Sequence, residues 1–445
     1  MGSGKTTAAR ALGLPGVDTD DLVEEGAGKP IAEIFREEGE AAFRAQEEQA
    51  VVLALGGGAV TSPGVRDALG GALTIWLDVD VDACWERVRG SGRPLAQDED
   101  EFRRLFETRR ELYAEVADVV AHDVHDVVLA AAGVHVERGA LQRLGELVPG
   151  DAKIALVSDP TVAGIHGMDA QLALGSRLAQ VQVLPPGEEA KTPDAVGSLW
   201  RGLHIDRSGT IVALGGGCTT DAAGFAAATY LRGVAWVAVP TSLLAQVDAA
   251  IGGKTAIDLP EGKNLVGAFH WPARTVIDPA LLETLPEPQR LEGMAEVVKT
   301  GLLAGEPLWE LPDDELVRRC AAFKASVCLR DPHERGERAM LNLGHTFAHG
   351  LEAAAGYAGL THGRAVALGL LAGLRLSGRD TQVVEEVLRP EPARVDPERA
   401  WEAMHRDKKA RGGELRLVLL GDDGPRWDVA VPEEDVRREL DRLIA

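Results

Sequence analysis

Two apolar segments that each end in three glycines constrain the fold of this chain more than any other feature. They are Val51–Gly58 (VVLALGGG) and Ile211–Gly217 (IVALGGG). A short, continuous apolar run bounded by glycine is typical of a buried parallel strand that leads into a tight loop. Four further segments predict strands of the same kind: Leu73–Leu77, Ile154–Val157, Val181–Leu184 and Val234–Val239.

Helical stretches such as Ile31–Gln49 and Glu101–Val116 separate these strands. The alternation predicts α/β layers built on doubly wound parallel sheets. From about Pro286 the periodicity becomes mostly helical. It predicts helices over Ala339–Ala355 and Arg364–Ser377 and a late strand over Glu414–Leu420. We therefore expect an α/β chain of three domains, over residues 1–122, 123–258 and 259–445, the last of them mostly helical.

Charge and composition exclude several classes of protein. The 445 residues include 47 basic and 70 acidic side chains, which leave a net charge of −23. This balance argues against a general nucleic-acid-binding protein, which needs a basic face. No apolar run reaches the roughly 20 residues of a transmembrane helix. The four cysteines form no CxxC pair, so we expect free thiols and a cytoplasmic location.

The chain begins with the second half of a phosphate-binding loop, Gly2-Ser3-Gly4-Lys5-Thr6-Thr7. In such a loop small residues let backbone N–H groups surround the phosphates, the lysine contacts them, and the hydroxyl of Thr6 holds Mg²⁺. The full motif also has an earlier glycine and a preceding strand, which would lie before Met1. A chance glycine turn is the alternative interpretation of these residues alone.

The motifs that follow make the resemblance specific. Asp18-Thr19-Asp20, the triple glycine at 56–58, Arg93-Pro94-Leu95 and Arg109–Tyr113 (RRELY) come in this order. With them, residues 1–120 resemble shikimate kinase, although the stretches from Thr7 to Asp18 and from Gln46 to Val51 are shorter than is usual. The resemblance implies that Gly2 to Thr7 bind ATP with Mg²⁺. The further residues that it assigns are Arg93 over the phosphates, Asp20 at the shikimate hydroxyl, Arg44 and Arg109 at its carboxylate, and Gly57 beside its ring.

A second group of motifs begins with the glycines at 215–217, which are followed by Asp221 and Gly224. Glycines after a strand permit close backbone approach to a dinucleotide pyrophosphate. The spacing is not GxGxxG, so a structural tight turn remains the alternative. Lysines and an asparagine then flank further glycine turns in the segments 240–254 and 262–264.

Acidic and histidine residues in the helical part suggest a metal site. They lie in Gly293–Lys299 (GMAEVVK), Asn342–His349 (NLGHTFAH) and His362-Gly363. Carboxylate and imidazole groups suit Zn²⁺ or a similar divalent ion. His345 and His349 are four residues apart and share one helix face, so spacing alone predicts that both are ligands.

These segments, with a Lys408-Lys409 pair, occur in the order found in 3-dehydroquinate synthase, which residues 125–445 resemble. The resemblance implies Zn²⁺ or Co²⁺ on Glu296, His345 and His362, and it moves His349 to the substrate. For NAD⁺ it implies Asp159, Glu188, Lys191, Gly217, Cys218, Thr219, Thr220, Asp221, Thr241, Ser242, Lys254, Lys263, Leu281, Leu282, Glu283 and Thr284. For catalysis and substrate binding it implies Asp248, Lys254, Asn264, Lys299, Lys324, Arg338, Asn342, His349, Lys408 and Lys409.

The implied reaction converts 3-deoxy-D-arabino-heptulosonate 7-phosphate to 3-dehydroquinate and phosphate, with NAD⁺ regenerated in each cycle and a homodimer as the expected assembly. The many cations suit a substrate that carries a carboxylate and a phosphate. Three alternatives remain at this point. The first is a synthase with a non-catalytic kinase domain, the second a metal-dependent alcohol or glycerol dehydrogenase, and the third a related sugar-phosphate cyclase.

Overall fold

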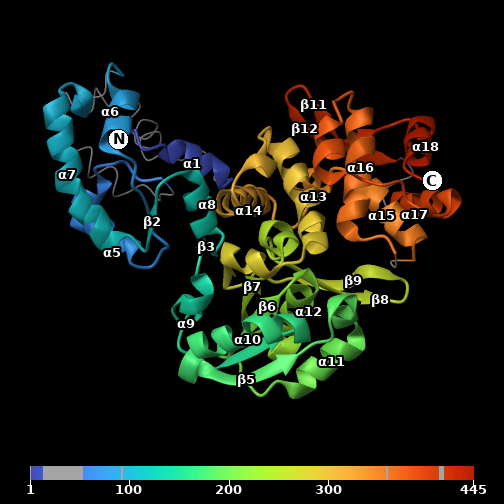
Figure 1. Cartoon of the computed structure of the whole chain (residues 1–445). Coiled ribbons are helices and arrows are strands. Elements are labelled where there is room, and N and C mark those ends of the chain that lie inside the picture. The colour runs from blue at the N-terminus through green and yellow to red at the C-terminus, as the bar shows by residue number, and fades with distance from the viewer. Residues whose placement is uncertain (1, 14–53, 92–93, 357–358, 410–414) are drawn as a thin grey trace. The chain divides into compact units, whose positions relative to one another are not determined.

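A computed structural model describes residues 2–13, 54–91, 94–356, 359–409 and 415–445 (Figure 1). The expected helix Ile31–Gln49, the start of the expected strand Val51–Gly58, and Asp20, Arg44 and Arg93 lie outside the described residues. The chain divides into two compact units, Met1–Ala132 and Gly133–Ala445. Each is described by itself.

The first unit contains a short parallel sheet and helices. Strands β1 (Ile75–Leu77) and β2 (Val119–Ala121) pair in parallel, with Ile75 opposite Val119. The helices are α1 (Lys5–Ala11), α5 (Pro63–Leu69), α6 (Val81–Val88), α7 (Glu99–Val116) and α8 (Val124–Ala131), with 3-10 turns at Ala59–Thr61 and Pro94–Ala96. The predicted strand Leu73–Leu77 and helix Glu101–Val116 are confirmed by β1 and α7.

Helix starts in this unit follow the expected capping chemistry. The carboxylate of Asp98 accepts the backbone N–H of Glu101 at 2.8 Å, and three acidic residues occupy the first turn of α7. Both arrangements favour the N-terminal end of a helix, because they satisfy free N–H groups and oppose the positive end of the helix dipole. Asp80 and Asp123 cap α6 and α8 in the same way.

The second unit is built on a six-stranded parallel sheet in the order β3-β10-β7-β6-β4-β5. The strands are β3 (Val134–Val136), β4 (Ile154–Ser158), β5 (Leu178–Val183), β6 (Thr210–Gly215), β7 (Ala235–Pro240) and β10 (Arg274–Ile277). The sequence predicted β4, β5, β6 and β7, and the structure confirms them. Strands β4 and β6 are buried throughout, as their continuous apolar runs indicate.

Helices cover both faces of this sheet and lead to an antiparallel hairpin (Figure 1). They are α9 (Leu144–Leu147), α10 (Pro160–Leu174), α11 (Pro193–Gly202) and α12 (Gly217–Thr229), with 3-10 turns at Ala140–Arg143, Gly175–Arg177, Gly187–Lys191, Tyr230–Arg232 and Pro279–Thr284 and a π-helical turn at Ala245–Ala249. The hairpin pairs β8 (Lys254–Leu259) with β9 (Gly262–Phe269). Because β10 follows the hairpin, the sheet takes strands from both sides of residue 258.

The remainder of this unit is mostly helical, as the sequence predicts. It contains α13 (Glu287–Ala304), α14 (Asp313–Arg330), α15 (His345–Ala354), α16 (His362–Leu376), α17 (Pro397–Lys409) and α18 (Glu433–Arg442), with shorter turns at Leu308–Glu310, Glu337–Asn342 and Val384–Leu388. A hairpin of β11 (Arg416–Gly421) and β12 (Gly424–Ala430) confirms the predicted late strand. None of the described helices is long and apolar enough to cross a membrane.

One predicted element is wrong. The sequence predicts a single helix over Ala339–Ala355, but the structure has a 3-10 turn over Glu337–Asn342 and then α15, which starts at His345. Gly344 separates them with a φ of 79°, a left-handed conformation that favours glycine. The break has a packing cause, described with the site below.

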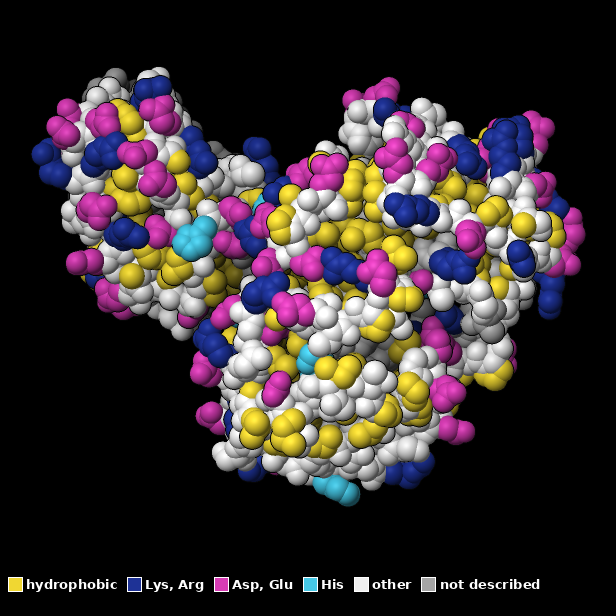
Figure 2. All heavy atoms as spheres, in the orientation of Figure 1, with side chains coloured by type: hydrophobic (Ala, Val, Ile, Leu, Met, Phe, Trp, Pro, Cys, Tyr) yellow, Lys and Arg dark blue, Asp and Glu magenta, His cyan; other side chains and the backbone are white. Residues whose placement is uncertain are grey.

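On the face drawn in Figure 2, acidic side chains are interspersed with basic ones over both units. Ion pairs at the surface of the molecule include Arg437 with Glu398 and Arg143 with Glu137. Exposed pairs of this kind contribute little to stability. The buried charges inside the second unit therefore carry more information about function.

Candidate active sites

The strand order of the second unit creates a crevice between β4 and β6. The chain passes from β4 to β5 on one side and returns to β6 on the other, which is the switch point where open α/β sheets bind ligands. Asp159 directly follows β4 and is buried there. Its carboxylate accepts the backbone N–H groups of Thr161 at 2.9 Å and Val162 at 3.1 Å, and the hydroxyl of Thr219 at 3.5 Å.

The glycines after β6 bring backbone close to this crevice. A Cβ on Gly215 would lie 2.6 Å from the Cβ of Thr219, so the turn leaves no room for a side chain. Helix α12 then begins at Gly217 with no side-chain cap. The helix thus begins directly after β6 without a capping side chain, an arrangement suited to an anion.

Other residues of the expected NAD⁺ set surround the same loop. The N–H of Thr241, directly after β7, donates to the carbonyl of Gly215 at 3.0 Å. A Cβ on Gly216 would lie 3.4 Å from the Oγ of Ser242. Thr220 donates to the carbonyl of Gly217 at 3.0 Å, and burial raises the pKa of the neighbouring Cys218 thiol to about 12.

The last four residues of the expected NAD⁺ set lie in the 3-10 turn Pro279–Thr284, and their surroundings differ from one another. Leu281 and Leu282 are buried in the core. Thr284 bonds the ring of His166 at 2.8 Å. The side chain of Glu283 is 70% exposed and pairs with Arg138 at 2.6 Å.

Lys191 contacts residues of two sets that the sequence analysis kept apart, the expected cofactor residues and the expected substrate residues. Its buried ammonium lies 2.8 Å from Asp221 Oδ2 and 2.5 Å from Asn264 Oδ1, and 3.9 Å from Asp258. Burial opposes the charged form, but Asp221 and its acidic neighbours outweigh it and raise the pKa of Lys191 to about 12. Next to it, Lys263 pairs with Glu188. Sequence reasoning missed Asp258, which no motif marked.

Three residues of the helical part form a compact set of possible metal ligands: Glu296, His345 and His362. One ligand atom from each lies within 4.8 Å of the others. Glu296 Oε1 is 3.4 Å from His345 Nε2 and 3.2 Å from His362 Nε2. The ring of His349 packs edge-on against His345, with centroids 5.6 Å apart, and belongs to no such set among the described residues. Helical spacing alone therefore indicated the wrong partner for His345.

Close helix packing explains how His345 reaches this position. Helix α15 starts against the middle of α16, where a Cβ on Gly344 would lie 2.8 Å from the backbone nitrogen of Leu370. A Cβ on Gly369 would lie 2.0 Å from the carbonyl oxygen of Gly344. Only glycines allow the two backbones to approach so closely, and this approach interrupts the predicted helix.

Two carboxylates that the sequence analysis missed hold His362. Its Nδ1 lies 3.3 Å from Glu352 Oε1, and Glu292 accepts the N–H of the next residue, Gly363, at 2.6 Å. Burial disfavours protonation of His362, but Glu296 and Glu352 outweigh it and raise its pKa to about 10. The spacing of seven residues between His345 and Glu352 could have indicated that both lie on one helix face.

A buried network of charges adjoins the histidines. The ammonium of Lys299 contacts Glu296 and lies 3.8 Å from Asp248, and Lys324 lies 2.8 Å from Asp248. Lys299 is only 2% exposed. Burial alone would raise the pKa of Asp248, but Lys324 and Lys299 lower it. The structure thus brings together four residues that the resemblance assigned to the metal and the substrate.

Further expected substrate residues lie on the loop before α15. Glu334, which the sequence analysis missed, contacts the ammonium of Lys254 and accepts from Asn342 at 3.1 Å. Arg338 is buried and donates to the backbone carbonyls of Gly252 at 2.9 Å and Pro332 at 3.0 Å. Lys408 and Lys409 end helix α17, and their side chains lie outside the described part of the structure.

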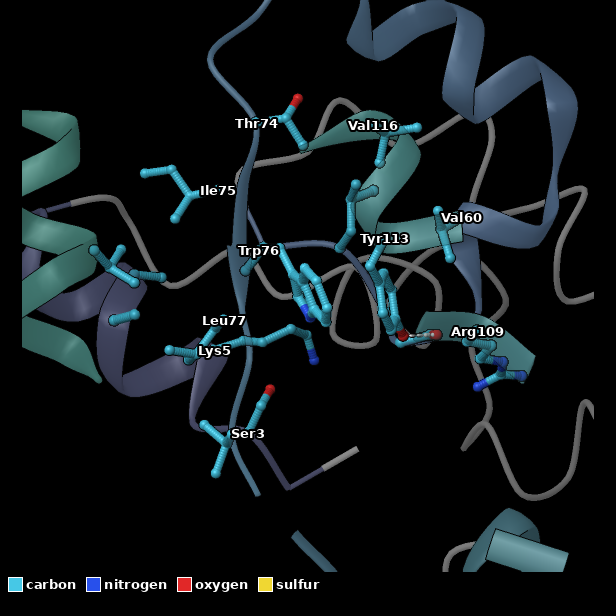
Figure 3. Close-up of a pocket in the computed structure, with 18 of the residues that line it drawn as sticks. Ser3, Lys5, Val60, Thr74, Ile75, Trp76, Leu77, Arg109, Tyr113 and Val116 are labelled. Atoms are coloured by element: carbon cyan, nitrogen blue, oxygen red, sulfur yellow. Dashed lines mark hydrogen bonds between the residues drawn. The ribbon is translucent and has the colours of Figure 1, made fainter. Parts of the chain in front are cut away.

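The first unit contains a cavity of about 410 Å³ that is lined in part by its phosphate-loop residues (Figure 3). Ser3, Lys5, Gly57 and Arg109 line it together with many apolar side chains. Figure 3 shows Lys5 turned toward the same space as the rings of Trp76 and Tyr113. The hydroxyl of Tyr113 donates to the carbonyl of Gly57.

The loop residues before α1 have the conformations that small residues permit. Gly2 and Gly4 have φ angles of 75° and 95°. A Cβ on Gly2 would lie 2.5 Å from the carbonyl oxygen of Cys84, and the carbonyl of Gly2 accepts from Arg87 at 2.9 Å. Thr6 and Thr7 lie in the first turn of α1.

Family comparisons agree with this geometry. Residues 181–292 match the family described as 3-dehydroquinate synthase N-terminal, and residues 293–410 match 3-dehydroquinate synthase C-terminal. The 3-dehydroquinate synthase of Bordetella pertussis is 40% identical over 342 residues, which cover 69% of this chain and 95% of that protein.

The chain belongs to the 3-dehydroquinate synthase family. The synthase of Salinibacter ruber is 44% identical over 285 residues, covering 57% of this chain and 78% of that one. Residues 1–134 match the shikimate kinase family, so a kinase domain precedes the synthase in one chain.

Two solved structures extend the likeness of the synthase part. A 2-deoxy-scyllo-inosose synthase, solved with carbaglucose-6-phosphate, NAD⁺ and Co²⁺, is 28% identical with a TM-score of 0.63. A 2-epi-5-epi-valiolone synthase from Streptomyces hygroscopicus, with NAD⁺ and Zn²⁺ bound, is 25% identical with a TM-score of 0.62. Each match covers 70% of this chain and 96% of the solved chain.

Proposed function

We propose that residues 133–445 convert 3-deoxy-D-arabino-heptulosonate 7-phosphate to 3-dehydroquinate and phosphate, using NAD⁺ and a divalent metal. We also propose that the first unit transfers a phosphoryl group from ATP to shikimate. The observation that carries the synthase proposal is the enclosed set of Glu296, His345 and His362 beside the buried charges of Lys299, Asp248 and Lys324. Membership of the synthase family supports the choice of substrate.

The residues present fit a divalent metal. A buried carboxylate and two imidazole nitrogens offer the donor types that Zn²⁺ and Co²⁺ accept, and three protein ligands leave positions for substrate oxygens. When bound, the metal would polarise the hydroxyl oxygens of the substrate. The protein contributes the closed arrangement, since Glu296 is fully buried and comes from a different helix than either histidine.

The crevice between β4 and β6 fits NAD⁺. Asp159, the glycine turn and the start of α12 lie at the switch point, where a pyrophosphate can approach the backbone. When bound, NAD⁺ would accept a hydride from the substrate and return it within the same cycle. Lys191 and Asn264, which touch each other, would connect this cofactor site to the substrate.

The cations of the helical part would bind the substrate's two anionic groups. Lys299 and Lys324 are held by Asp248, and Lys254 is held by Glu334, so these side chains are already oriented. Charge-assisted hydrogen bonds from such groups suit carboxylate and phosphate oxygens. Arg338, Asn342, His349 and Lys408 or Lys409 complete the proposed pocket.

The decisive experiment measures phosphate release from the heptulosonate phosphate by the purified chain, with NAD⁺ and Zn²⁺. We expect release that stops with a chelator, resumes on addition of Zn²⁺ or Co²⁺, and produces no net NADH. Net accumulation of NADH would instead indicate a dehydrogenase. Turnover of a ketose phosphate or hexose phosphate without a carboxylate would indicate a related cyclase.

The kinase proposal rests on Lys5 and Arg109, which line one cavity with Gly57. Lys5 would contact the phosphates of ATP, Thr6 would hold Mg²⁺, and Arg109 would bind the shikimate carboxylate. A coupled assay of ADP formation tests this activity. We expect ADP formation that requires shikimate and Mg²⁺, whereas ADP formation independent of shikimate would contradict the proposal.

We further propose that the chain acts in the cytoplasm as a homodimer. The four cysteines are free thiols in the structure, as a reducing compartment requires. Light scattering after size-exclusion chromatography measures the mass of the assembly. A mass of twice 47.2 kDa is expected, and a single-chain mass at micromolar concentration would contradict it.

A further inference from the structure

His362 lies between two carboxylates, one at each ring nitrogen. Its Nε2 is 3.2 Å from Glu296 Oε1, and its Nδ1 is 3.3 Å from Glu352 Oε1. A neutral imidazole carries one proton, so a donor bond from Nδ1 to Glu352 leaves Nε2 with a free electron pair. In the metal-free protein Nε2 bonds the carboxylate of Glu296, and a metal that replaced the Nε2 proton would use this electron pair in the space that the three possible ligands share.

Glu352 belongs to the same helix as another member of that set. It lies seven residues after His345 on α15, which places both side chains on one face of the helix. Helix α15 packs against α16, whose first residue is His362. One helix thus supplies both a possible ligand and the carboxylate that holds the ligand from the next helix.

The burial of Glu352 points to a specific partner. It is only 4% exposed, and a buried carboxylate is costly unless it is paired or accepts hydrogen bonds. His362 provides that donor. The hydrogen bond to the imidazole therefore offsets the cost of burying this carboxylate.

We propose that Glu352 is a positioning residue of the metal site: its carboxylate accepts a hydrogen bond from Nδ1–H of His362 and so directs Nε2 toward the metal. This inference rests on the proposed function, because it assumes that the set of Glu296, His345 and His362 binds a metal. Carboxylates in this position fix the ring and its tautomer and make the imidazole a better ligand.

Glu292 has a different task at the same place. It accepts the backbone N–H of Gly363 at 2.6 Å and the side-chain hydroxyl of Thr361 at 2.5 Å, and so holds both chain neighbours of His362. Glu352 instead touches the ring. The two acids therefore fix the start of α16 and the orientation of the imidazole separately.

The test uses Co²⁺ as the probe, added to the metal-free full chain. The dissociation constant comes from competition with a chelator, and the visible absorption of Co²⁺ reports its ligand geometry. We expect Glu352→Ala to weaken Co²⁺ binding about 10- to 100-fold and to change the spectrum. Glu352→Gln keeps an acceptor oxygen without charge, so we expect a smaller loss of several-fold, because charge-assisted bonds are about twice as strong as neutral ones.

A buried acid elsewhere in the same unit provides the matched control. Glu439 is 3% exposed on α18 and pairs with Arg442 at 2.6 Å, remote in sequence from the ligands. We expect Glu439→Gln to lower thermal stability and leave the Co²⁺ dissociation constant unchanged. A general loss of stability would lower Co²⁺ affinity in both variants and would overturn the specific role.

The remaining outcomes separate the two proposals. If the unaltered chain binds no Co²⁺, the metal site of the proposed function fails. If the unaltered chain binds Co²⁺ and the folded Glu352→Ala variant shows the same dissociation constant and spectrum, the positioning role is overturned. Should Glu352→Ala not fold, an unchanged dissociation constant in Glu352→Gln has the same consequence.

Discussion

The synthase site and the kinase cavity surround their lysines with different kinds of side chain. In the second unit, Lys299, Lys324 and Lys254 each contact a carboxylate of the same chain. In the first unit, Lys5 and Arg109 line a cavity whose other walls are largely apolar. The synthase charges are thus oriented within a network of the protein's own groups.

The difference predicts different responses to substitution. A buried network ties catalysis to stability, since the loss of one partner leaves another charge buried and uncompensated. In the kinase cavity, the described residues give Lys5 no carboxylate partner, so its replacement removes a contact to ligand without breaking a described ion pair. Substitution of a buried synthase lysine should therefore lower both activity and stability. Substitution of the kinase lysine should lower activity alone.

The largest effect is expected from Lys299→Ala. Its ammonium contacts Glu296 and lies 3.8 Å from Asp248, so its loss removes a proposed substrate contact and takes one cationic partner from each of two buried carboxylates. We expect phosphate release to fall at least about 1,000-fold and the free energy of unfolding to fall by about 3–5 kcal/mol. Phosphate assays and urea unfolding measure the two quantities.

The first unit serves as an internal control for this variant. Shikimate-dependent ADP formation by Lys299→Ala should equal that of the unaltered chain. Native phosphate release in the folded variant would remove Lys299 from the proposed site. Loss of turnover with native stability would show that the buried network is not needed for folding.

Lys5→Ala tests the other side of the comparison. Because Lys5 is proposed to contact the transferred phosphate, we expect shikimate phosphorylation to fall about 100- to 1,000-fold. The side chain is half-buried and lines the cavity, so the unfolding transition should not move. Phosphate release from the heptulosonate phosphate is the control and should stay native; a large fall in stability would contradict the comparison.

The sequence predicted the sheet better than the contacts within the site. Continuous apolar runs such as Ile211–Leu214 were correctly predicted as buried strands. A strand that is buried on both faces needs apolar residues at every position, and such a run is visible in the sequence. No local sequence pattern distinguishes acidic residues such as Glu334 and Glu352 from acids at the surface. Their roles depend on which helices meet, and that arrangement is not visible in local spacing.

The histidines show the same limit. Spacing favours His345 with His349, which share a helix face, whereas the structure sets His345 beside His362 from the next helix. The family resemblance assigned His345 and His362 to one metal site. Helical periodicity could not do so, because it gives no information on contacts between different helices. The break at Gly344 was missed for the same reason, because its cause is the approach of α16.

Gly344→Ala measures how far the synthase site depends on that approach. The substitution adds a Cβ 2.8 Å from the nitrogen of Leu370 at a residue with a φ of 79°. We expect about 1–3 kcal/mol of destabilisation and weaker Co²⁺ binding, because His345 is the next residue. Gly305→Ala is the matched control, since it has a φ of 71° and nothing within 4 Å. Equal effects from both variants would mean that strain, and not the contact with α16, matters.

The smallest effect is expected from Glu334→Gln. Burial opposes ionisation of Glu334, but Lys254 and Asn342 outweigh it and lower its pKa in the folded protein. A lowered pKa stabilises the fold above the unfolded value of about 4.3, and this contribution is lost as the pH falls through the folded value. Because the lysine is half exposed, we expect a difference of only about 1 kcal/mol between the two proteins at pH 7.

Urea unfolding between pH 7 and pH 3 measures this difference. It should be constant down to about pH 5 and shrink at lower pH, as the carboxylate of Glu334 becomes protonated and resembles the amide. Glu261→Gln, at an exposed turn of the β8–β9 hairpin, is the control for removing an acidic side chain that lies at the surface. A difference that grows as the pH falls would mean that Glu334 is not paired with Lys254 before substrate binds. Lys254 would then resemble Lys5 of the kinase cavity, and the contrast between the two sites would reduce to the buried pairs around Asp248.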